Sequence, residues 1–185
     1  MAVLMPGRVL AALWLLLPAS SGRTGQYDQP SADQVKAVFL FNFAQFVEWP
    51  AVAFTAPDAP LVIGVLGKDP FGAFLDETIR GEIVRGHPLE VRRFASIADI
   101  ETCHILYVSR SEAVRLTNIL HDLKGRPILT VGEGTVFVQS GGIIAFSSLR
   151  NRIRMRINNA AARAAQLAIS SKLLRVAEST GPGSP

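Results

Sequence analysis

The chain has 185 residues, a formal net charge of +4 and a single cysteine, Cys103. A chain of this length can bury the core of one ordinary domain, and a lone cysteine excludes an internal disulfide. Packing must therefore hold the domain together, and we expect Cys103 to be a buried, unreactive thiol.

The N-terminal residues have the pattern of a secretory signal peptide. Arg8 precedes the apolar run Val9–Leu17, and small residues follow up to a cleavage site expected near Ser21. The run is shorter than the roughly 20 residues that span a bilayer, so a permanent anchor is the less favoured alternative. We expect residues 1–21 to be a signal peptide and residues 22–30 to form a flexible lead-in.

Export limits the classes of partner. The mature protein is expected in the periplasm, where a chain seldom meets nucleic acid, so nucleic acid is not an expected partner. The mild positive charge instead favours an anionic protein, a small anionic ligand or a membrane surface.

The segment 35–50, which reads VKAVFLFNFAQFVEWP, holds four Phe and one Trp. Ser31 and Gln34 have the spacing of a capping box, so we predict a helix that begins at Ser31. It should end at Glu48 or Trp49, because a residue that precedes proline disfavours helical geometry.

The polar residues of this helix form one narrow stripe of Asn42, Gln45 and Glu48. Apolar residues occupy the rest of its circumference, so the helix either lies in the core on most sides or shares its surface with a partner.

Strand and helix patterns alternate through the rest of the chain. Apolar runs predict strands at 61–66, 103–108, 128–131 and 143–146, with two short strands at 83–84 and 89–94. Helical patterns occupy 71–80, 111–123 and about 158–177. These elements predict an α/β fold, a single-domain mixed sheet flanked by helices over residues 31–178, followed by a disordered tail at 179–185.

The turn after the strand 61–66 lacks the spacing of a nucleotide-binding loop. Its glycines are too close together for a P-loop, no Ser or Thr follows Lys68, and the third glycine of a dinucleotide fingerprint is absent. We expect Asp69 to cap the next helix, with Pro70 at its first position. Free helix amides there could hold a small anion, which makes Lys68, Asp69 and Phe71 an alternative ligand site.

No residue pattern indicates a metal or a catalytic centre. His87, His121 and the Cys103–His104 pair lack the short spacings that bring metal ligands together. A Gly-x-Ser-x-Gly motif is absent, and the serines near strand ends have no recognisable base. We therefore expect no metal, no cofactor and no catalytic residue, which disfavours a hydrolase.

Arginines occupy every second position from 150 to 156, and Ile153, Met155 and Ile157 alternate with them. A strand with this period places the arginines on one face and the apolar residues on the other. One interpretation is a solvated face partly neutralised by an acid on a neighbouring strand, such as Glu90. The other is a docking strip for an acidic partner, with binding that depends on salt.

Several segments, taken in order, resemble the YfiR family of periplasmic regulatory proteins. They are 35–50, 65–72 (VLGKDPFG), 103–109 (CHILYVS), 129–131, 141–146, 152–158 and 169–176 (ISSKLLRV). The match extends over nearly all of the mature chain, and the order and spacing of the segments make it specific.

The resemblance implies an α/β domain that is not an enzyme. It implies a protein that represses a membrane-bound diguanylate cyclase through the periplasmic sensor region of that cyclase, and so controls cyclic-di-GMP. An outer-membrane lipoprotein that sequesters the protein is a further implied partner, and a homodimer is one state to consider. The best-known members carry disulfides, whereas Cys103 has no partner here, so intramolecular redox switching is not expected.

The expected partner-binding residues combine both arguments. They are Arg152, Arg154 and Arg156 of the alternating segment, with Phe43 and Trp49 of the aromatic helix. The alternative hypothesis is a periplasmic binder of a small anionic ligand near Lys68.

Overall fold

The computed structural model describes residues 30–150 and 152–180. The expected signal peptide, residues 22–29 of the expected lead-in and residues 181–185 of the expected tail lie outside the described residues.

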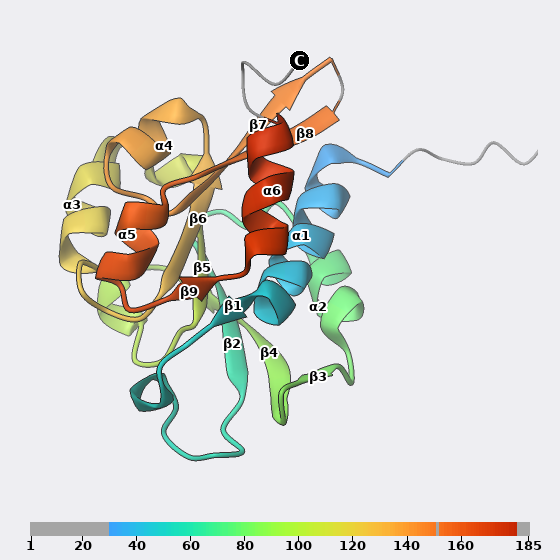
Figure 1. Cartoon of the computed structure of the whole chain (residues 1–185), viewed down its shortest axis with the longest axis vertical. Coiled ribbons are helices and arrows are strands. Elements are labelled where there is room, and N and C mark those ends of the chain that lie inside the picture. The colour runs from blue at the N-terminus through green and yellow to red at the C-terminus, as the bar shows by residue number, and fades with distance from the viewer. Residues whose placement is uncertain (1–29, 151, 181–185) are drawn as a thin grey trace, which may run out of the picture.

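A mixed sheet of seven strands forms the centre of the described chain (Figure 1). Its order is β3-β4-β2-β5-β6-β7-β8, and its strands are β2 (Leu61–Leu66), β3 (Ile83–Val84), β4 (His87–Phe94), β5 (Ile105–Val108), β6 (Leu129–Glu133), β7 (Ile144–Leu149) and β8 (Arg152–Ile157). Strands β4, β2, β5, β6 and β7 are parallel, whereas β3 and β8 are antiparallel edge strands. The fold is the expected single-domain α/β architecture with a mixed sheet.

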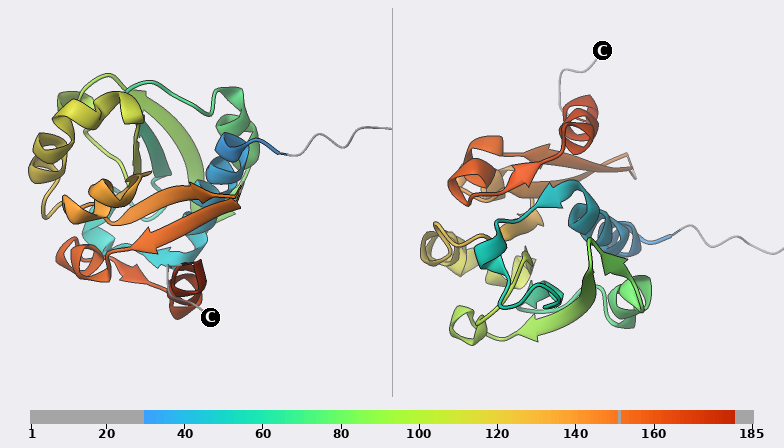
Figure 2. Two further views of the ribbon diagram at one scale, coloured as in Figure 1. Left: turned by 90° about the horizontal axis from the view of Figure 1, so that it is seen from above. Right: turned by 60° about the horizontal axis from the view of Figure 1, so that its bottom comes forward.

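Helices cover both faces of this sheet, as the three views together show (Figure 2). On one face, Leu40 of α1 (Ala32–Phe46), Leu75 of α2 (Ala73–Ile79) and Leu173 of α6 (Ser171–Thr180) belong to one apolar cluster. On the other face, Ile119 of α3 (Leu116–Asp122) and Phe137 of α4 (Thr135–Gln139) belong to a second cluster. Every residue of β2 is buried because both of its faces are covered.

The aromatic helix α1 begins as predicted. The Ser31 hydroxyl accepts a hydrogen bond from the Gln34 amide, and the Gln34 side chain accepts one from the Ser31 amide. The helix ends at Phe46, earlier than predicted, because Val47–Glu48 forms the strand β1. This strand pairs antiparallel with β9 (Ala168–Ile169), which lies far along the sequence.

The predicted long helix at 158–177 is wrong. The structure has a short helix α5 (Asn159–Ala164), the strand β9 and then the separate helix α6. Gln166 adopts a left-handed conformation with φ of 58°, and the Leu167 amide donates back to the Ala162 carbonyl at 2.9 Å. This geometry is a helix C-terminus, and it turns the side chain of Leu167 into the core.

Two other predicted helices have different beginnings. Helix α2 begins at Ala73 rather than at 71, because the Asp69 carboxylate accepts from the Phe71 amide at 2.7 Å in a turn before the helix. The predicted helix 111–123 begins as a 3-10 helix, Arg110–Arg115, and α3 continues from there.

Candidate functional site

The arginine strip, defined here as Arg152, Arg154 and Arg156, lies on the edge strand β8. Met155 between them is buried, and Ile153 packs against the α1 side of the core. Arg152 and Arg156 are exposed, while Arg154 is half-buried. The alternating pattern therefore places its two kinds of side chain as expected, one kind on each face.

Arg150 does not extend the strip. It lies before β8 with a left-handed φ of 49°, so the regular alternation begins at Arg152. The one-sided row of arginines expected from the sequence therefore has three members rather than four.

The cross-strand neighbours of the strip are not acidic. Arg156 is opposite Ala145, Arg154 is opposite Ser147 and Arg152 is opposite Leu149 on β7. Glu90, the acid considered for neutralising the strip, lies on β4, and β2, β5, β6 and β7 separate that strand from β8. It pairs with Arg92 on its own strand at 2.9 Å, so its expected place beside the strip is wrong.

A hollow of about 260 Å³ opens beside the strip, between the β7–β8 hairpin and the beginning of α4. Its lining includes Arg154, Arg156, Ser147 and Thr135, with Phe146 among its apolar residues. Leu149 at the end of β7 also lines it, and this apolar residue is 50% exposed. Guanidinium groups make forked hydrogen bonds with carboxylates, so this surface suits a partner that offers acidic and apolar side chains together.

The structure does not bring the expected aromatic residues into this surface. Phe43 has no exposed surface, and its ring stacks on Phe39 and on Phe146 with centroids 6.2 and 5.9 Å away. It therefore cannot touch a partner of the folded protein, and we remove it from the candidate surface. Trp49 is half-buried and donates from Nε1 to the His104 carbonyl at 3.1 Å, away from the hollow's lining.

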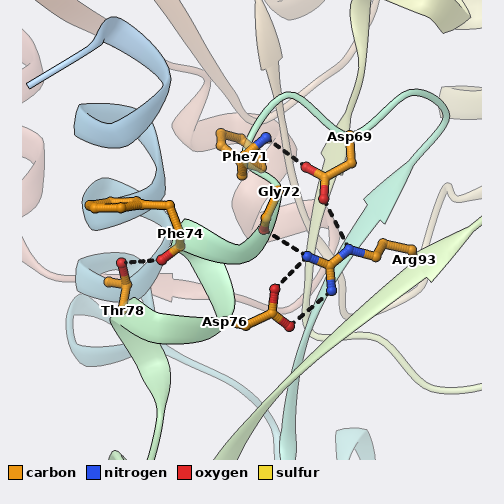
Figure 3. A network of polar contacts seen from close by, with 7 residues as sticks. All are labelled: Asp69, Phe71, Gly72, Phe74, Asp76, Thr78 and Arg93. Atoms are coloured by element: carbon orange, nitrogen blue, oxygen red, sulfur yellow. Dashed lines mark hydrogen bonds and ion pairs between the residues drawn. The ribbon is translucent and has the colours of Figure 1, made fainter.

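The alternative ligand turn uses its polar groups internally (Figure 3). The Lys68 amide donates to the Ser111 hydroxyl at 3.0 Å, and the Asp69 carboxylate accepts from Arg93 at 2.9 Å. Phe71 is buried, with its ring edge-on to Tyr107 at 4.8 Å. Only the Lys68 side chain is exposed among the three expected ligand residues, so this turn offers little to a small anion.

Arg93 holds the same turn from the neighbouring strand β4. It donates to both carboxylate oxygens of Asp76 and to the Gly72 carbonyl, in addition to Asp69. The hydrogen bonds that Arg93 donates to Asp76 lower the pKa of the Asp76 carboxyl from its usual value and raise the pKa of Arg93. The turn is therefore a structural joint between β2, α2 and β4.

A polar cluster that sequence reasoning missed joins α1 to the sheet. Lys36 donates to Glu133 at 2.8 Å and to Asp33 at 2.9 Å, and the Tyr107 hydroxyl donates to the same Glu133 oxygen at 2.6 Å. In the sequence, the cluster is indicated only by Lys36, a lysine inside an apolar helix segment. The position of this lysine does not indicate that Glu133 is its partner.

The charges of this cluster stabilise one another. Burial opposes charge on Lys36 and Glu133. The hydrogen bonds and charges of Glu133 and Asp33 together outweigh burial at Lys36 and raise its pKa. The hydrogen bonds of Lys36 and Tyr107, with the nearby positive charges, outweigh burial at Glu133 and lower its pKa. Burial and the neighbouring Glu133 carboxylate both raise the pKa of Tyr107. At neutral pH the cluster therefore holds a fixed ammonium, a fixed carboxylate and a neutral phenol, which suits a structural clamp rather than proton transfer.

Among the other groups considered from the sequence, Cys103 and His104 lie in the interior. Cys103 is buried, and burial raises the pKa of its thiol to about 12. The next residue in the sequence, His104, is fully buried as well. Across residues 30–150 and 152–180, no group of three or more His, Cys, Asp or Glu side chains gathers as metal ligands do.

Comparison with known proteins connects these residues to one family. A family model described as YfiR/HmsC-like matches residues 33–178, which is almost the whole described chain. No curated protein matches this chain significantly. Within the described residues, no helix is long and apolar enough to cross a membrane.

Proposed function

Because the chain belongs to the YfiR/HmsC-like family, we propose that it is a periplasmic regulatory protein that represses a membrane-bound signalling protein by direct contact. The signalling protein in this proposal is a diguanylate cyclase, bound through its periplasmic sensor region, and the output is the level of cyclic-di-GMP. An outer-membrane lipoprotein that binds the repressor would release the cyclase, and a homodimer would present the contact surface twice.

The observation that carries this proposal is the arginine strip beside its hollow. The strip lies on an edge strand with no acidic residue opposite it, and the hollow offers apolar surface next to the guanidinium groups. Charged groups arranged in this way increase the rate and specificity of association with an acidic partner, and their effect decreases with salt. We place the partner's acidic residues against Arg152 and Arg156, the two exposed members of the strip.

Binding also accounts for the polar residues better than catalysis does. Lys36, Tyr107 and Glu133 satisfy one another. The Ser109 hydroxyl, at the end of β5, accepts a hydrogen bond from the Ser111 amide. The small-anion alternative at Lys68, Asp69 and Phe71 has little support, since two of the three residues are committed to internal contacts.

Charge reversal of the exposed arginines tests the proposal. We expect Arg152→Glu combined with Arg156→Glu to abolish repression, measured as the cyclic-di-GMP level of cells that carry the membrane partner. The melting temperature should stay within a few degrees of the original, because neither side chain is buried. Binding of the purified partner domain to the unchanged protein should weaken as ionic strength rises.

The matched control reverses two exposed charges elsewhere. Arg163→Glu combined with Lys172→Glu changes the net charge equally, on α5 and α6. Repression that survives the strip variant, or that is lost equally in the control, would remove the strip from the proposed mechanism.

A further inference from the structure

A groove between α3 and α5 lies apart from the arginine strip. It has a volume of about 400 Å³, and its lining contains no aspartate or glutamate. Figure 1 shows α3 and α5 in the same part of the molecule, and the lining residues come from both helices. The volume lies within the range of about 300–1,000 Å³ that is typical of small-molecule sites.

The floor of the groove is apolar and firmly packed. It is lined by Leu120 of α3, by Leu123 directly after that helix, and by Ile128 and Ile143 beside the sheet, each less than one-tenth exposed. The side of α5 contributes alanines, among them Ala164, whose small side chains leave the space open.

The rim of the groove is basic. His121 and Lys124 are exposed, and Arg126 is half-buried with its guanidinium donating to the Ile100 carbonyl at 2.8 Å. That hydrogen bond fixes the position of the Arg126 side chain and leaves other N–H groups of the fork for a ligand. Asp122 lies next to the rim and its carboxylate contacts His121 at 3.3 Å, so the cations of the rim are Lys124 and Arg126. An apolar floor with these two cations at its rim is complementary to a ligand with one anionic head and an apolar body.

We propose that this groove binds a small amphipathic carboxylate. Its carboxylate lies between Lys124 and Arg126, and its hydrocarbon body covers Leu120, Ile143 and the alanines of α5. Charge-assisted hydrogen bonds orient the head, and the area of apolar surface removed from water supplies most of the affinity.

The groove adjoins both ends of the β7–β8 hairpin that carries the arginine strip. Ile143 immediately precedes β7, and Asn158 immediately follows β8. The Asn158 side chain accepts from the Ala161 amide of α5 at 3.0 Å and donates to the Val138 carbonyl of α4 at 3.4 Å. A ligand on α5 would therefore contact a helix that is hydrogen-bonded to the end of the hairpin. Binding of this ligand does not depend on the proposed function.

Octanoate is a suitable probe, with octylamine as the control of equal length and opposite charge. We expect octanoate, below the concentration at which it forms micelles, to bind saturably by calorimetry and to raise the melting temperature by mass action. Amide NMR shifts should concentrate in α3, α5 and residues 124–126. Octylamine should bind at least about tenfold more weakly, because the rim repels its ammonium group.

Two variants test separately the contact with the ligand's carboxylate and the space for its hydrocarbon body. Lys124→Glu should weaken octanoate binding by about tenfold or more, whereas Lys68→Glu, on an exposed lysine outside the groove, should leave it unchanged. Ala164→Leu should fill the groove and abolish binding, whereas Ala160→Leu, at an exposed position of α5 outside the lining, should not.

Equal binding of octanoate and octylamine, or NMR shifts spread over other surfaces, would overturn the proposal. A change of oligomeric state in Ala164→Leu without any ligand, measured by light scattering, would also overturn it, because the groove would then be an interface between copies. The two proposals fail separately. If the groove variants lose octanoate binding but still repress, the proposed function stands. The strip variant, which should lose repression, should still bind octanoate.

Discussion

Among single residues, His104 has the environment most sensitive to pH. Its Nδ1 accepts a hydrogen bond from the Val62 amide at 3.0 Å, and its Nε2 lies 3.1 Å from the Ala53 carbonyl, to which it donates in the neutral tautomer. Phe54 stacks on its ring at 4.4 Å and on the ring of His87 at 3.9 Å. The imidazole therefore links β2, β5 and the segment 51–60 only while it is neutral.

This environment predicts that acid destabilises the protein through His104. Burial, with a smaller contribution from the charges of His87 and Arg92, lowers the pKa of His104 from 6.5 to about 4. Between these values the unfolded chain binds a proton that the folded chain does not, so stability falls as pH falls. We expect this residue alone to remove on the order of 3 kcal/mol from the free energy of unfolding across that window, as measured by denaturant titrations at several pH values.

A glutamine variant isolates this contribution from that of the carboxylates. His104→Gln should flatten the pH dependence between pH 6.5 and about 4 while lowering stability at neutral pH. His121→Gln, on a histidine whose side chain is 83% exposed, should not change the slope. An unchanged slope in His104→Gln would show that His104 is not the group that titrates.

Among elements, the joint of β2, α2 and β4 depends on one guanidinium. Arg93 contacts two carboxylates and a carbonyl at once, and the planar fork of arginine matches this geometry better than a lysine ammonium does (Figure 3). Its side chain is 39% exposed, so solvent weakens each ion pair.

Replacing this arginine by lysine should therefore loosen the joint even though the charge remains. We expect Arg93→Lys to lower the free energy of unfolding by about 1–2 kcal/mol and to increase hydrogen exchange in residues 69–79. Arg92→Lys, which alters a single exposed pair with Glu90 on the same strand, should change stability by less than about 0.5 kcal/mol. Equal losses in the two variants would contradict a special role for the Arg93 fork.

At the scale of the whole molecule, two apolar clusters share one sheet. Neighbouring residues of β2 belong to different clusters, with Val65 in the α1 cluster and Leu66 in the α3 cluster. Neither cluster can lose its packing without exposing strands that the other also covers.

This arrangement predicts one cooperative unfolding transition. Leu40→Ala on the α1 side and Leu120→Ala on the α3 side should each destabilise the protein, by about 2–5 kcal/mol for a fully buried leucine. Each variant should shift the same single transition, seen both by circular dichroism and by fluorescence of Trp49 in a chain without its first 21 residues. Separate transitions by the two probes would show that the halves unfold independently.

Patterns that depend on near neighbours were predictable in this chain. The capping box of Ser31 and Gln34, the buried strand 61–66 and the alternation of 152–157 all arise from interactions within a few residues. The fold class follows from the order of such elements, because helices that alternate with apolar strands must cover both faces of a sheet.

Features that depend on distant segments were not predictable. The aromatic helix stops at Phe46 because β1 pairs with β9, and the alanine-rich helix breaks at Gln166 so that β9 can reach it. Glu133 stands 97 residues from Lys36, so no local pattern pairs them.

The sequence by itself therefore determined most strands of the central sheet, the family resemblance and the one-sided placement of the arginines, because the repeat of a strand or helix decides which residues share a face. Only the tertiary structure decided what each face meets. It placed Phe43 in the core, put Glu90 several strands away from the arginine strip and committed Asp69 to Arg93. Burial and pairing are properties of packed neighbours, and packing brings together residues that the sequence keeps far apart.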